Sequence, residues 1–384
     1  MRVNIQQPAL PNYRHALFKL LSKQVDIDLC VYYSSVDHTL PNIVTNDYKS
    51  KYYPIHRLHI FKKYYFLWHS PQWFCSSKVV SDVVILSWDL HYLSLLPSIL
   101  RARFNRIPVI LWGHGVSKND NWFKSNIRRW VSKLSSSIIL YDYHTAEAYI
   151  KLGFNNSRIF VAPNSIDQSA ISMSKKYWGQ CESKLQSFQK ENKIDTETTI
   201  VYIGRVYFEN RLDTLIRALS RMKCNFPSIK LIVIGAGDIE IAKLKSLSVR
   251  IGASENILWV GATYNEQDIA KWMLSSTIFC YPENIGLSIM HAFGYGLPVI
   301  ASDNIKSHNP EIHSLKPNIN GLLYENNSLD SLVSTLTKVL SDKDHCKVLS
   351  KNALETVEQE FNINQMVFGF KKAIHYPYFK KNEQ

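Results

Sequence analysis

Short, continuously apolar runs alternate with amphipathic stretches along the whole chain. Such runs are typical of strands buried on both faces of a parallel sheet, because helices cover both sides of these sheets. Between the runs, one helical stripe is formed by Leu212, Leu215, Ile216, Leu219 and Met222. The runs cover residues 83–88, 107–113, 137–140 and 158–163 in the first half, and 199–204, 230–235, 257–261, 277–282 and 297–303 in the second. The alternation predicts an α/β protein.

Length and a polar, strand-free stretch divide the chain into two domains. The 384 residues are many for one compact domain and suit two. We expect a first domain over 1–175, a linker over 176–198 and a second domain over 199–365. The tail, 366–384, is expected to pack back toward the first domain. Both domains are predicted to be Rossmann-like, with doubly wound parallel sheets.

The positive charge is concentrated in the first half. Residues 1–180 hold 22 of the 45 Lys and Arg but only 10 of the 32 Asp and Glu, so they carry +12 of the formal +13. An anionic membrane, an anionic acceptor or nucleic acid would explain this excess, and so would a solvated basic surface. Because no RNA- or DNA-binding motif appears, we expect no nucleic-acid partner.

Cysteine spacing and the N-terminus indicate the compartment. The six cysteines include no closely spaced pair, and Cys30 and Cys280 lie in apolar runs, so we expect reduced thiols. The N-terminus lacks the apolar core of a signal peptide, and no run of 18 apolar residues appears. We expect a cytoplasmic protein, with the inner face of the plasma membrane as a second location.

Strand-to-helix junctions in the second half are the candidate ligand sites, since ligands of parallel sheets bind beyond the carboxyl ends of the strands. At the first junction Arg205 directly follows Gly204, and Arg211 stands near the start of the next helix. Two guanidinium groups placed in this way can bind a diphosphate. The alternative is that both are ordinary surface arginines.

Two further junctions contain glycines. Gly235 and Gly237 form a turn after a strand, but the third glycine of a dinucleotide fingerprint is absent, which favours an ordinary turn. Later, Glu283 follows a strand, and a loop with Gly286 leads to a helix starting near Leu287. The loop amides suit a phosphate and Glu283 suits sugar hydroxyls, although the carboxylate could merely cap the helix.

Taken together, GRVYFENRLDTLIRAL, LIVIGAG and GLSIMHAFGYGLPVIAS resemble the C-terminal domain of family 4 glycosyltransferases, in order between about 199 and 340. In the first half, ILWGHG and RIFVAPNSID are similar to the family's N-terminal domain. These are retaining enzymes of the GT-B architecture, in which two Rossmann-like domains face a cleft. The resemblance implies a hexosyltransferase that moves a sugar from a nucleoside diphosphate to a glycan hydroxyl, in bacterial surface polysaccharide synthesis. It implies no cofactor and no metal.

The resemblance also implies residue roles. Arg205 would neutralise the donor diphosphate, Glu283 would face the donor sugar, and His114 would lie near the sugar's reacting face. The catalytic set is therefore His114, Glu283 and Arg205. The donor-binding set is Arg205, Arg211, Gly235, Ile285, Gly286, Leu287 and His291.

The chain departs from the family pattern at two positions. Asn210 occupies the place of an expected lysine, and His291 occupies that of the glutamate that grips the ribose. Histidine can still hydrogen-bond a ribose, but as a pH-sensitive partner. These changes leave open a catalytically lapsed partner subunit, and a sugar-nucleotide epimerase of the same fold is a further alternative.

Residues 122–134 interleave basic and apolar side chains in the basic half. The pattern suits a helix that lies on an anionic membrane and takes a lipid-linked glycan acceptor. It suits equally well an amphipathic helix packed on its own sheet. The residues are Lys124, Arg128, Arg129 and Lys133, with Trp122, Phe123, Ile127, Trp130 and Val131.

Overall fold

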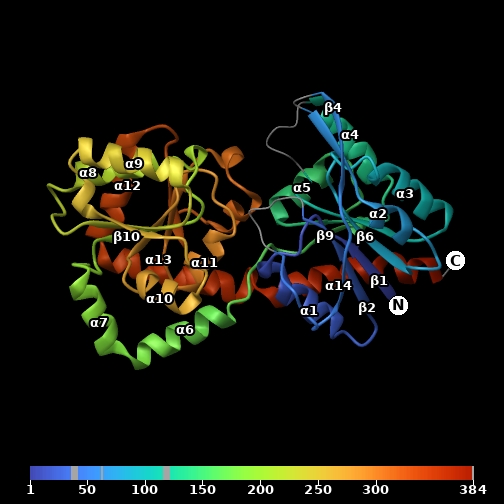
Figure 1. Cartoon of the computed structure of the whole chain (residues 1–384), viewed down its shortest axis with the longest axis horizontal. Coiled ribbons are helices and arrows are strands. Elements are labelled where there is room, and N and C mark those ends of the chain that lie inside the picture. Colours follow the sequence, from blue (N-terminus) through green and yellow to red (C-terminus); the bar gives the residue numbers. More distant parts are fainter. Residues whose placement is uncertain (36–41, 62–63, 116–121, 383–384) are drawn as a thin grey trace. The chain divides into compact units, whose positions relative to one another are not determined.

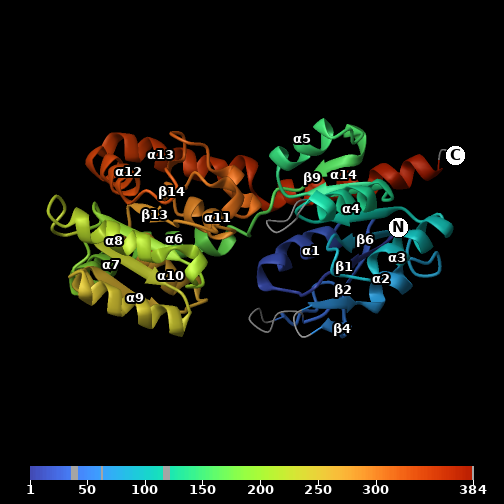
Figure 2. The same ribbon diagram turned by 90° about the horizontal axis from the view of Figure 1, so that it is seen from above.

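The computed structural model describes residues 1–35, 42–61, 64–115 and 122–382. It divides into two compact units (Figures 1 and 2). Unit 1 comprises Met1–Ile166 together with Ile363–Gln384, and unit 2 comprises Asp167–Asn362. The last helix of the chain therefore belongs to the same unit as the first strand.

The boundary between the units lies earlier than the sequence suggested. The region 176–198, which we expected to be a linker, is largely helical and belongs to unit 2. It holds the end of α6 (Ser169–Gln180) and all of α7 (Glu182–Glu191). Trp178 of α6 donates its indole N–H to the Gln267 carbonyl at 2.9 Å, and α6 packs on α10 (Glu266–Met273). These contacts, which spacing alone does not reveal, attach the segment to unit 2.

Unit 1 contains a seven-stranded parallel sheet in the order β3-β2-β1-β6-β7-β8-β9. The chain order reverses beside β1, so successive strands are added on both sides of it. An antiparallel hairpin of β4 (His56–Phe61) and β5 (Tyr64–Trp68) stands apart from this sheet. The strands are β1 (Arg2–Gln6), β2 (Asp28–Tyr33), β3 (Lys49–Tyr52), β6 (Val83–Ser87), β7 (Val109–Trp112), β8 (Ser137–Leu140) and β9 (Ile159–Val161).

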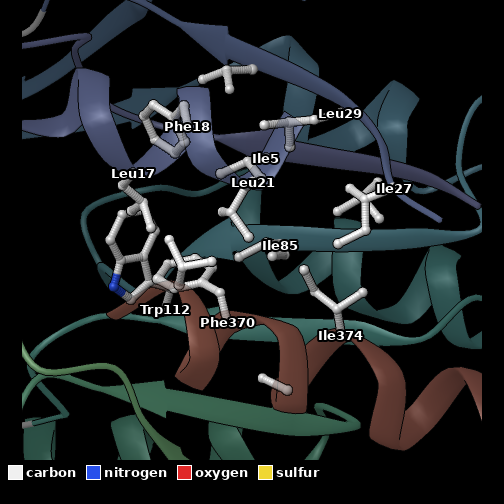
Figure 3. Close-up of a cluster of buried hydrophobic side chains, with 14 of the residues drawn as sticks. Ile5, Leu17, Phe18, Leu21, Ile27, Leu29, Ile85, Trp112, Phe370 and Ile374 are labelled. Atoms are coloured by element: carbon white, nitrogen blue, oxygen red, sulfur yellow. The ribbon is translucent and has the colours of Figure 1, made fainter. Parts of the chain in front are cut away.

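Two hydrophobic clusters in unit 1 hold its helices. One includes α1 (His15–Ser22) and α14 (Ile363–Asn382), and Figure 3 shows Phe370 and Ile374 of α14 pointing toward the sheet residue Ile85. The other takes side chains from the remaining helices. These are α2 (Ser70–Cys75), α3 (Leu95–Phe104), α4 (Trp122–Lys133) and α5 (Tyr143–Lys151). The sheet is thus covered partly by a helix from the far end of the chain.

Unit 2 contains a six-stranded parallel sheet in the order β12-β11-β10-β13-β14-β15. This order is that of a Rossmann-like sheet, and the reversal falls between β10 and β13. The strands are β10 (Thr199–Ile203), β11 (Lys230–Ile234), β12 (Ile257–Gly261), β13 (Ile278–Cys280), β14 (Val299–Ser302) and β15 (Gly321–Tyr324). The prediction of two doubly wound parallel sheets is confirmed.

Helices lie on both sides of this sheet (Figure 1). Helix α8 (Leu212–Met222) packs between α9 (Asp238–Arg250) and α12 (Leu329–Ser341). Its predicted apolar stripe is confirmed, because all five stripe residues are buried. On the other side, α11 (Ser288–Gly294) packs against α6 and α13 (Lys343–Glu355).

Candidate functional site

The reversal of strand order in unit 2 brings two of the predicted junctions together. Arg205 lies just beyond the end of β10, and Glu283 lies just beyond the end of β13, the neighbouring strand. In doubly wound sheets this position leaves a crevice for ligands between the diverging connections. The topology therefore places both residues at the expected ligand edge of the sheet.

Gly235 allows the first two junctions to approach each other. A Cβ atom on Gly235 would stand 1.8 Å from the Gly204 carbonyl oxygen, and one on Gly237 would stand 2.2 Å from the Val206 carbonyl oxygen. Both glycines also have positive φ, 157° and 147°. Only glycine fits such a close backbone approach. The observed role of Gly235 is backbone packing, and its place in the donor-binding set stays a prediction.

Asn210, the residue found in place of a lysine, is the hub between the two junctions. It is 1% exposed, and its amide nitrogen donates to the hydroxyls of Tyr202 and Tyr281 at 2.9 and 2.8 Å. The same nitrogen donates to the Arg205 carbonyl at 2.6 Å. Its amide oxygen accepts from Asn284 at 3.0 Å. Asn210 therefore joins the loops after β10 and β13 and is directed away from solvent.

The Arg205 side chain lies on the surface above this hub. Its guanidinium carbon stands 5.3 Å from the centre of the Tyr207 ring, and Nη1 donates to the Tyr207 hydroxyl at 3.4 Å. The Arg205 carbonyl oxygen accepts from Tyr202 and Asn210. The backbone is thus fixed while the exposed cation remains at the ligand edge of the sheet.

Arg211 is bound to its own surroundings. Its backbone is left-handed, with φ 54°, directly before α8. Its guanidinium donates to Asp213 at 3.1 Å, to Thr214 at 3.2 Å and to Asn327 at 3.3 Å. The ion pair with Asp213 offsets part of its charge. Arg211 stands where the sequence predicted, but within the described part of the chain its hydrogen bonds run to α8 and to the loop before α12.

The Glu283 carboxylate is held by two serine hydroxyls. Ser302 donates to Oε1 at 2.7 Å and Ser307 donates to Oε2, while Glu283 itself is 7% exposed. Ser302 in turn lies 3.1 Å from Nε2 of His308. A carboxylate accepts up to about four hydrogen bonds. Two serine donors therefore orient Glu283 and leave acceptor capacity for a hydroxyl of a ligand.

The loop between Glu283 and α11 offers fewer free amides than expected. The Ile285 N–H donates to Nδ1 of His308 at 3.2 Å, so it is already engaged. Among the residues that the structure describes, no acceptor bonds the N–H groups of Gly286 and Leu287. The predicted phosphate-facing amides are thus reduced to these two, because the imidazole of His308 takes the third.

His291 forms a pair with a carboxylate that the sequence did not single out. Its Nε2 lies 2.8 Å from Oε1 of Glu266, and the Tyr295 hydroxyl donates to the same oxygen. Burial alone would raise the pKa of Glu266, but the hydrogen bonds from His291 and Tyr295 lower it below its ordinary value. The pair places a carboxylate next to the position where the family has one.

His114 is the one predicted site residue in unit 1. It follows β7, and its ring centre lies 4.8 Å from that of Tyr141, which follows β8. The next residue, Gly115, has φ 71° and accepts a hydrogen bond from the Tyr149 hydroxyl at 2.6 Å. His114 therefore lies at the carboxyl end of its own sheet.

Sequence reasoning missed the partners that fix these side chains: Asn210 as a hub, Ser302, Ser307, His308 and Glu266. Only the polar stretch after the strand at 299–302 signalled part of this set. Across the described ranges, no helix is long and apolar enough to cross a membrane.

Comparison with known families bears on this geometry. The family model of glycosyl transferases group 1 matches residues 183–356, which include every predicted site residue of unit 2. Residues 183–356 are therefore similar to the glycosyl transferases group 1 family. A second model, that of polysaccharide pyruvyl transferase, matches residues 12–165, which lie within unit 1.

Curated proteins that are similar to parts of this chain include glycosyltransferases. The lipopolysaccharide 1,6-galactosyltransferase of Escherichia coli K12 is 27% identical over 157 residues, 38% of this chain and 41% of the relative. A UDP-Gal:alpha-D-GlcNAc-diphosphoundecaprenol alpha-1,3-galactosyltransferase of Escherichia coli is 24% identical over 283 residues, 70% of this chain and 69% of the relative. An uncharacterised Methanocaldococcus jannaschii glycosyltransferase is 24% identical over 47% of this chain and 45% of its own. The chain spans less than half the length of the first and third of these relatives.

Solved structures resemble the whole chain. Anabaena HepE in complex with UDP superposes with a TM-score of 0.70 at 14% identity, covering 97% of this chain and 99% of that one. Sucrose-phosphate synthase from Thermosynechococcus elongatus reaches 0.69 at 14% identity, covering 99% and 100%. The chain, with its two parallel α/β units, thus has the GT-B fold, as predicted.

Proposed function

We propose that the protein transfers a sugar from a nucleoside diphosphate to a hydroxyl of a glycan, with retention of the anomeric configuration. The observation that carries the proposal is that Arg205 follows β10 while Gly286 and Leu287, whose amides bond no acceptor among the described residues, follow the neighbouring strand β13 of unit 2. A cation and two N–H donors suit a diphosphate. Because HepE is described in complex with UDP and with UDP-glucose, we propose a UDP-hexose as the donor.

The chemistry follows from where charge develops. As the bond between sugar and diphosphate breaks, positive charge grows on the sugar and negative charge on the leaving diphosphate. Arg205 and the two amides would stabilise the diphosphate, and this stabilisation increases as the reaction proceeds. Glu283, oriented by Ser302 and Ser307, would accept a hydrogen bond from a donor-sugar hydroxyl. We propose that His114 acts at the reacting face of the sugar.

The ribose would be bound by the pair of Glu266 and His291. Glu266 holds a depressed pKa and stays ionised near neutral pH, so it accepts hydrogen bonds as a glutamate at position 291 would. We also propose that the diphosphate charge is balanced by protein groups and not by a metal. Transfer should then continue in excess EDTA, and a dependence on added Mg²⁺ would contradict this part.

Donor binding and turnover test the proposal. Calorimetric titration with UDP, GDP and ADP should show tightest binding of UDP. Transfer from UDP-hexoses to a diphosphoprenyl-linked sugar should be detected as formation of the glycosylated product. Arg205→Ala should lower kcat/KM by a factor of about 100 or more, the usual effect of losing one charge-stabilising group. Arg217→Ala, at an exposed arginine on α8, is the matched control.

A wild-type protein that binds no nucleotide would refute the donor site. Equal losses for Arg205→Ala and Arg217→Ala would refute the role of Arg205. A protein that binds UDP but turns over no donor would support the second candidate, a lapsed partner subunit. That candidate is favoured by two observations, the buried Asn210 in place of a lysine and the Arg211–Asp213 ion pair.

For the acceptor we propose a lipid-linked glycan, taken at the cytoplasmic face of the plasma membrane by unit 1. Unit 1 holds 24 of the 45 Lys and Arg and 10 of the 32 Asp and Glu, a formal charge of +14. On α4, Trp122, Phe123 and Trp130 are 78, 63 and 53% exposed, whereas Arg128 and Val131 are buried. Exposed aromatic side chains on a basic surface favour an anionic bilayer.

Vesicle flotation tests this surface. The protein should float with vesicles containing anionic lipid at low salt and dissociate at high salt, because counterions screen the attraction. Changing both Trp122 and Trp130 to Ser should weaken binding, whereas Leu100→Ser, at an exposed position on α3, should not. Absence of binding to anionic vesicles at low salt would overturn the membrane proposal.

A further inference from the structure

Arg14 is a buried cation with no counter-ion in the part of the chain that the structure describes. It ends the short helical turn Asn12–Arg14 just before α1, and 6% of its surface is exposed. Among the described residues, no carboxylate lies within ion-pair distance of its guanidinium, although Arg2, Arg211 and Arg221 each have one. Buried arginines are rare unless an anion accompanies them, because taking the charge out of water is costly.

The groups around Arg14 are neutral. Its guanidinium carbon lies 4.7 Å from the Trp112 ring centre and 5.3 Å from that of Tyr141. Its Nη1 donates to Oδ1 of Asn164 at 2.8 Å and contacts the Met366 sulfur at 3.8 Å. Its Nη2 donates to the Tyr141 hydroxyl at 3.2 Å. Aromatic faces and neutral acceptors hold the cation in place without cancelling its charge.

The guanidinium also retains donor capacity. An arginine offers five N–H groups, and the contacts above use three of them. The Nε–H of Arg14 has no acceptor among the described residues, yet its nitrogen is not fully buried. This N–H group therefore reaches solvent, with a free Nη2 N–H on the same guanidinium. Two adjacent N–H groups of a guanidinium can donate to two oxygens of the same oxyanion.

The position of Arg14 in unit 1 is that of a ligand site. Arg14 follows β1, Trp112 ends β7, Tyr141 follows β8 and Asn164 follows β9, so all four lie at the carboxyl edge of the parallel sheet. Ligands of such sheets bind at this edge. The ring of His114 contacts the same Tyr141 at 4.8 Å. Figure 3 shows Trp112 near Leu17 and Phe370, so the ring that the Arg14 guanidinium covers is itself fixed in the hydrophobic core.

We propose that Arg14 binds a phosphoryl group of a substrate, with its Nε–H and Nη2–H donating to two phosphate oxygens. The inference deepens the proposed function and rests on it for the identity of that substrate. The phosphoryl group belongs either to the nucleotide donor or to the diphosphate of a lipid-linked acceptor. In both cases the anion supplies the missing counter-ion beside His114, and Arg14 selects substrates that carry it.

Calorimetric titration of the full chain with two probes, UDP and farnesyl diphosphate, tests the proposal. Arg14→Gln should weaken the binding of one probe by a factor of about 10 or more, the effect of losing a charge-assisted pair of hydrogen bonds. Weaker binding of UDP would assign the phosphoryl group to the donor. Weaker binding of farnesyl diphosphate would assign it to the acceptor. Arg101→Gln is the matched control, because Arg101 also covers an aromatic ring, Trp73 at 4.4 Å, but on the outer helix α3.

Binding of both probes within a factor of two of wild type would overturn the proposal. If Arg14→Gln loses its near-ultraviolet circular dichroism, the decision passes to wild-type protein labelled with ¹⁵N-arginine. There the Arg14 Nε–H resonance should shift on adding the bound probe, and an unchanged resonance overturns the proposal. Unimpaired binding of both probes by Arg14→Gln, with loss of UDP binding in Arg205→Ala, would leave the proposed function standing while this inference fails.

Discussion

Asn210 illustrates how a single residue changes the character of a site. A lysine at this position would bring a cation to the diphosphate, whereas Asn210 is buried and joins Tyr202, Tyr281 and Asn284. Its amide can donate and accept at the same time, which an ammonium group cannot. The position thus serves the geometry of the two loops, and in the proposed function the positive charge comes from Arg205, five residues earlier.

We expect Asn210→Ala to lower the free energy of unfolding of unit 2 by about 2–3 kcal/mol, because two buried tyrosine hydroxyls and a carbonyl each lose one hydrogen bond. Urea denaturation measures the change. Glu209→Ala, at the exposed neighbouring residue, is the control and should change stability by less than about 0.5 kcal/mol. Equal effects of the two substitutions would show that Asn210 is not a hub.

The pair of Glu266 and His291 predicts a pH-dependent stability. Because the folded pKa of Glu266 lies below its ordinary value of 4.5, the ionised form stabilises the fold above about pH 4.5. This contribution is lost as the pH falls through the folded pKa. Glu266→Gln should therefore cost about 1–2 kcal/mol at pH 7, and the difference from wild type should shrink in acid.

Denaturant titrations of both proteins at pH 7 and pH 4 measure this difference. Glu255→Gln, at an exposed glutamate of the same unit, should follow wild type at both pH values. A difference that stays constant between the two pH values would contradict the assignment of the stabilisation to the ionised carboxylate.

The sequence predicts the positions of those site residues that directly follow a buried strand. Arg205 and Glu283 follow buried strands directly, so the position of each at a strand end was visible in the sequence. Their partners were not, because Ser302 lies 19 residues from Glu283 and Tyr281 lies 71 from Asn210. Such pairs depend on how the strands are ordered in the sheet, and one sequence does not encode this order in its spacing.

At the scale of elements, apolar runs predict most central strands but miss an edge strand of the first sheet. The run 137–140 became β8 and 257–261 became β12 with the predicted bounds, because both are continuously apolar. Strand β3 was missed, since three of its four residues are exposed and its sequence, KSKY, is polar. An edge strand can be polar, as β3 is, and hydrophobic runs then do not reveal it.

The packing of α14 on β9 gives a prediction with an unusual sign. An alanine normally stabilises a helix relative to glycine by about 1 kcal/mol. A Cβ on Gly369 of α14, however, would stand 2.2 Å from the Val161 carbonyl oxygen of β9. Gly369→Ala should therefore lower the stability of unit 1 by about 1–3 kcal/mol, as overpacking does.

Gly179 of α6 is the matched control, because a Cβ there would meet nothing within 4 Å. Gly179→Ala should leave the melting temperature unchanged or raise it. Differential scanning calorimetry compares the two proteins with wild type. A stabilised Gly369→Ala would show that α14 does not approach β9 this closely.

At the scale of the whole molecule, the chain leaves unit 1 after Ile166 and returns to it at Ile363. The charge follows the same division. Unit 2 holds the remaining 21 of the 45 Lys and Arg and 22 of the 32 Asp and Glu, a formal charge of −1 against +14 in unit 1. Because the tail adds four lysines, the return of the chain raises the charge of unit 1 while it completes its core.

Removal of α14 tests whether unit 1 depends on that return. In a chain ending at Asn362, the cluster shown in Figure 3 loses Met366, Phe370 and Ile374, which are fully buried. Unit 1 should then lose its cooperative unfolding transition and bind a hydrophobic dye, because each large apolar side chain contributes roughly 1.5–3 kcal/mol when buried. Unit 2 retains all its strands and should keep its transition.

A chain ending at Tyr378 is the control, since it keeps the buried residues of α14. It should melt like the full-length protein in calorimetry and bind no more dye. A 363–384 peptide added to the shorter chain should restore the lost transition in part, because it supplies the same apolar face without the covalent link. If the chain ending at Asn362 melts like the full protein, unit 1 does not need α14, and the division of the chain into two interleaved folding units is wrong.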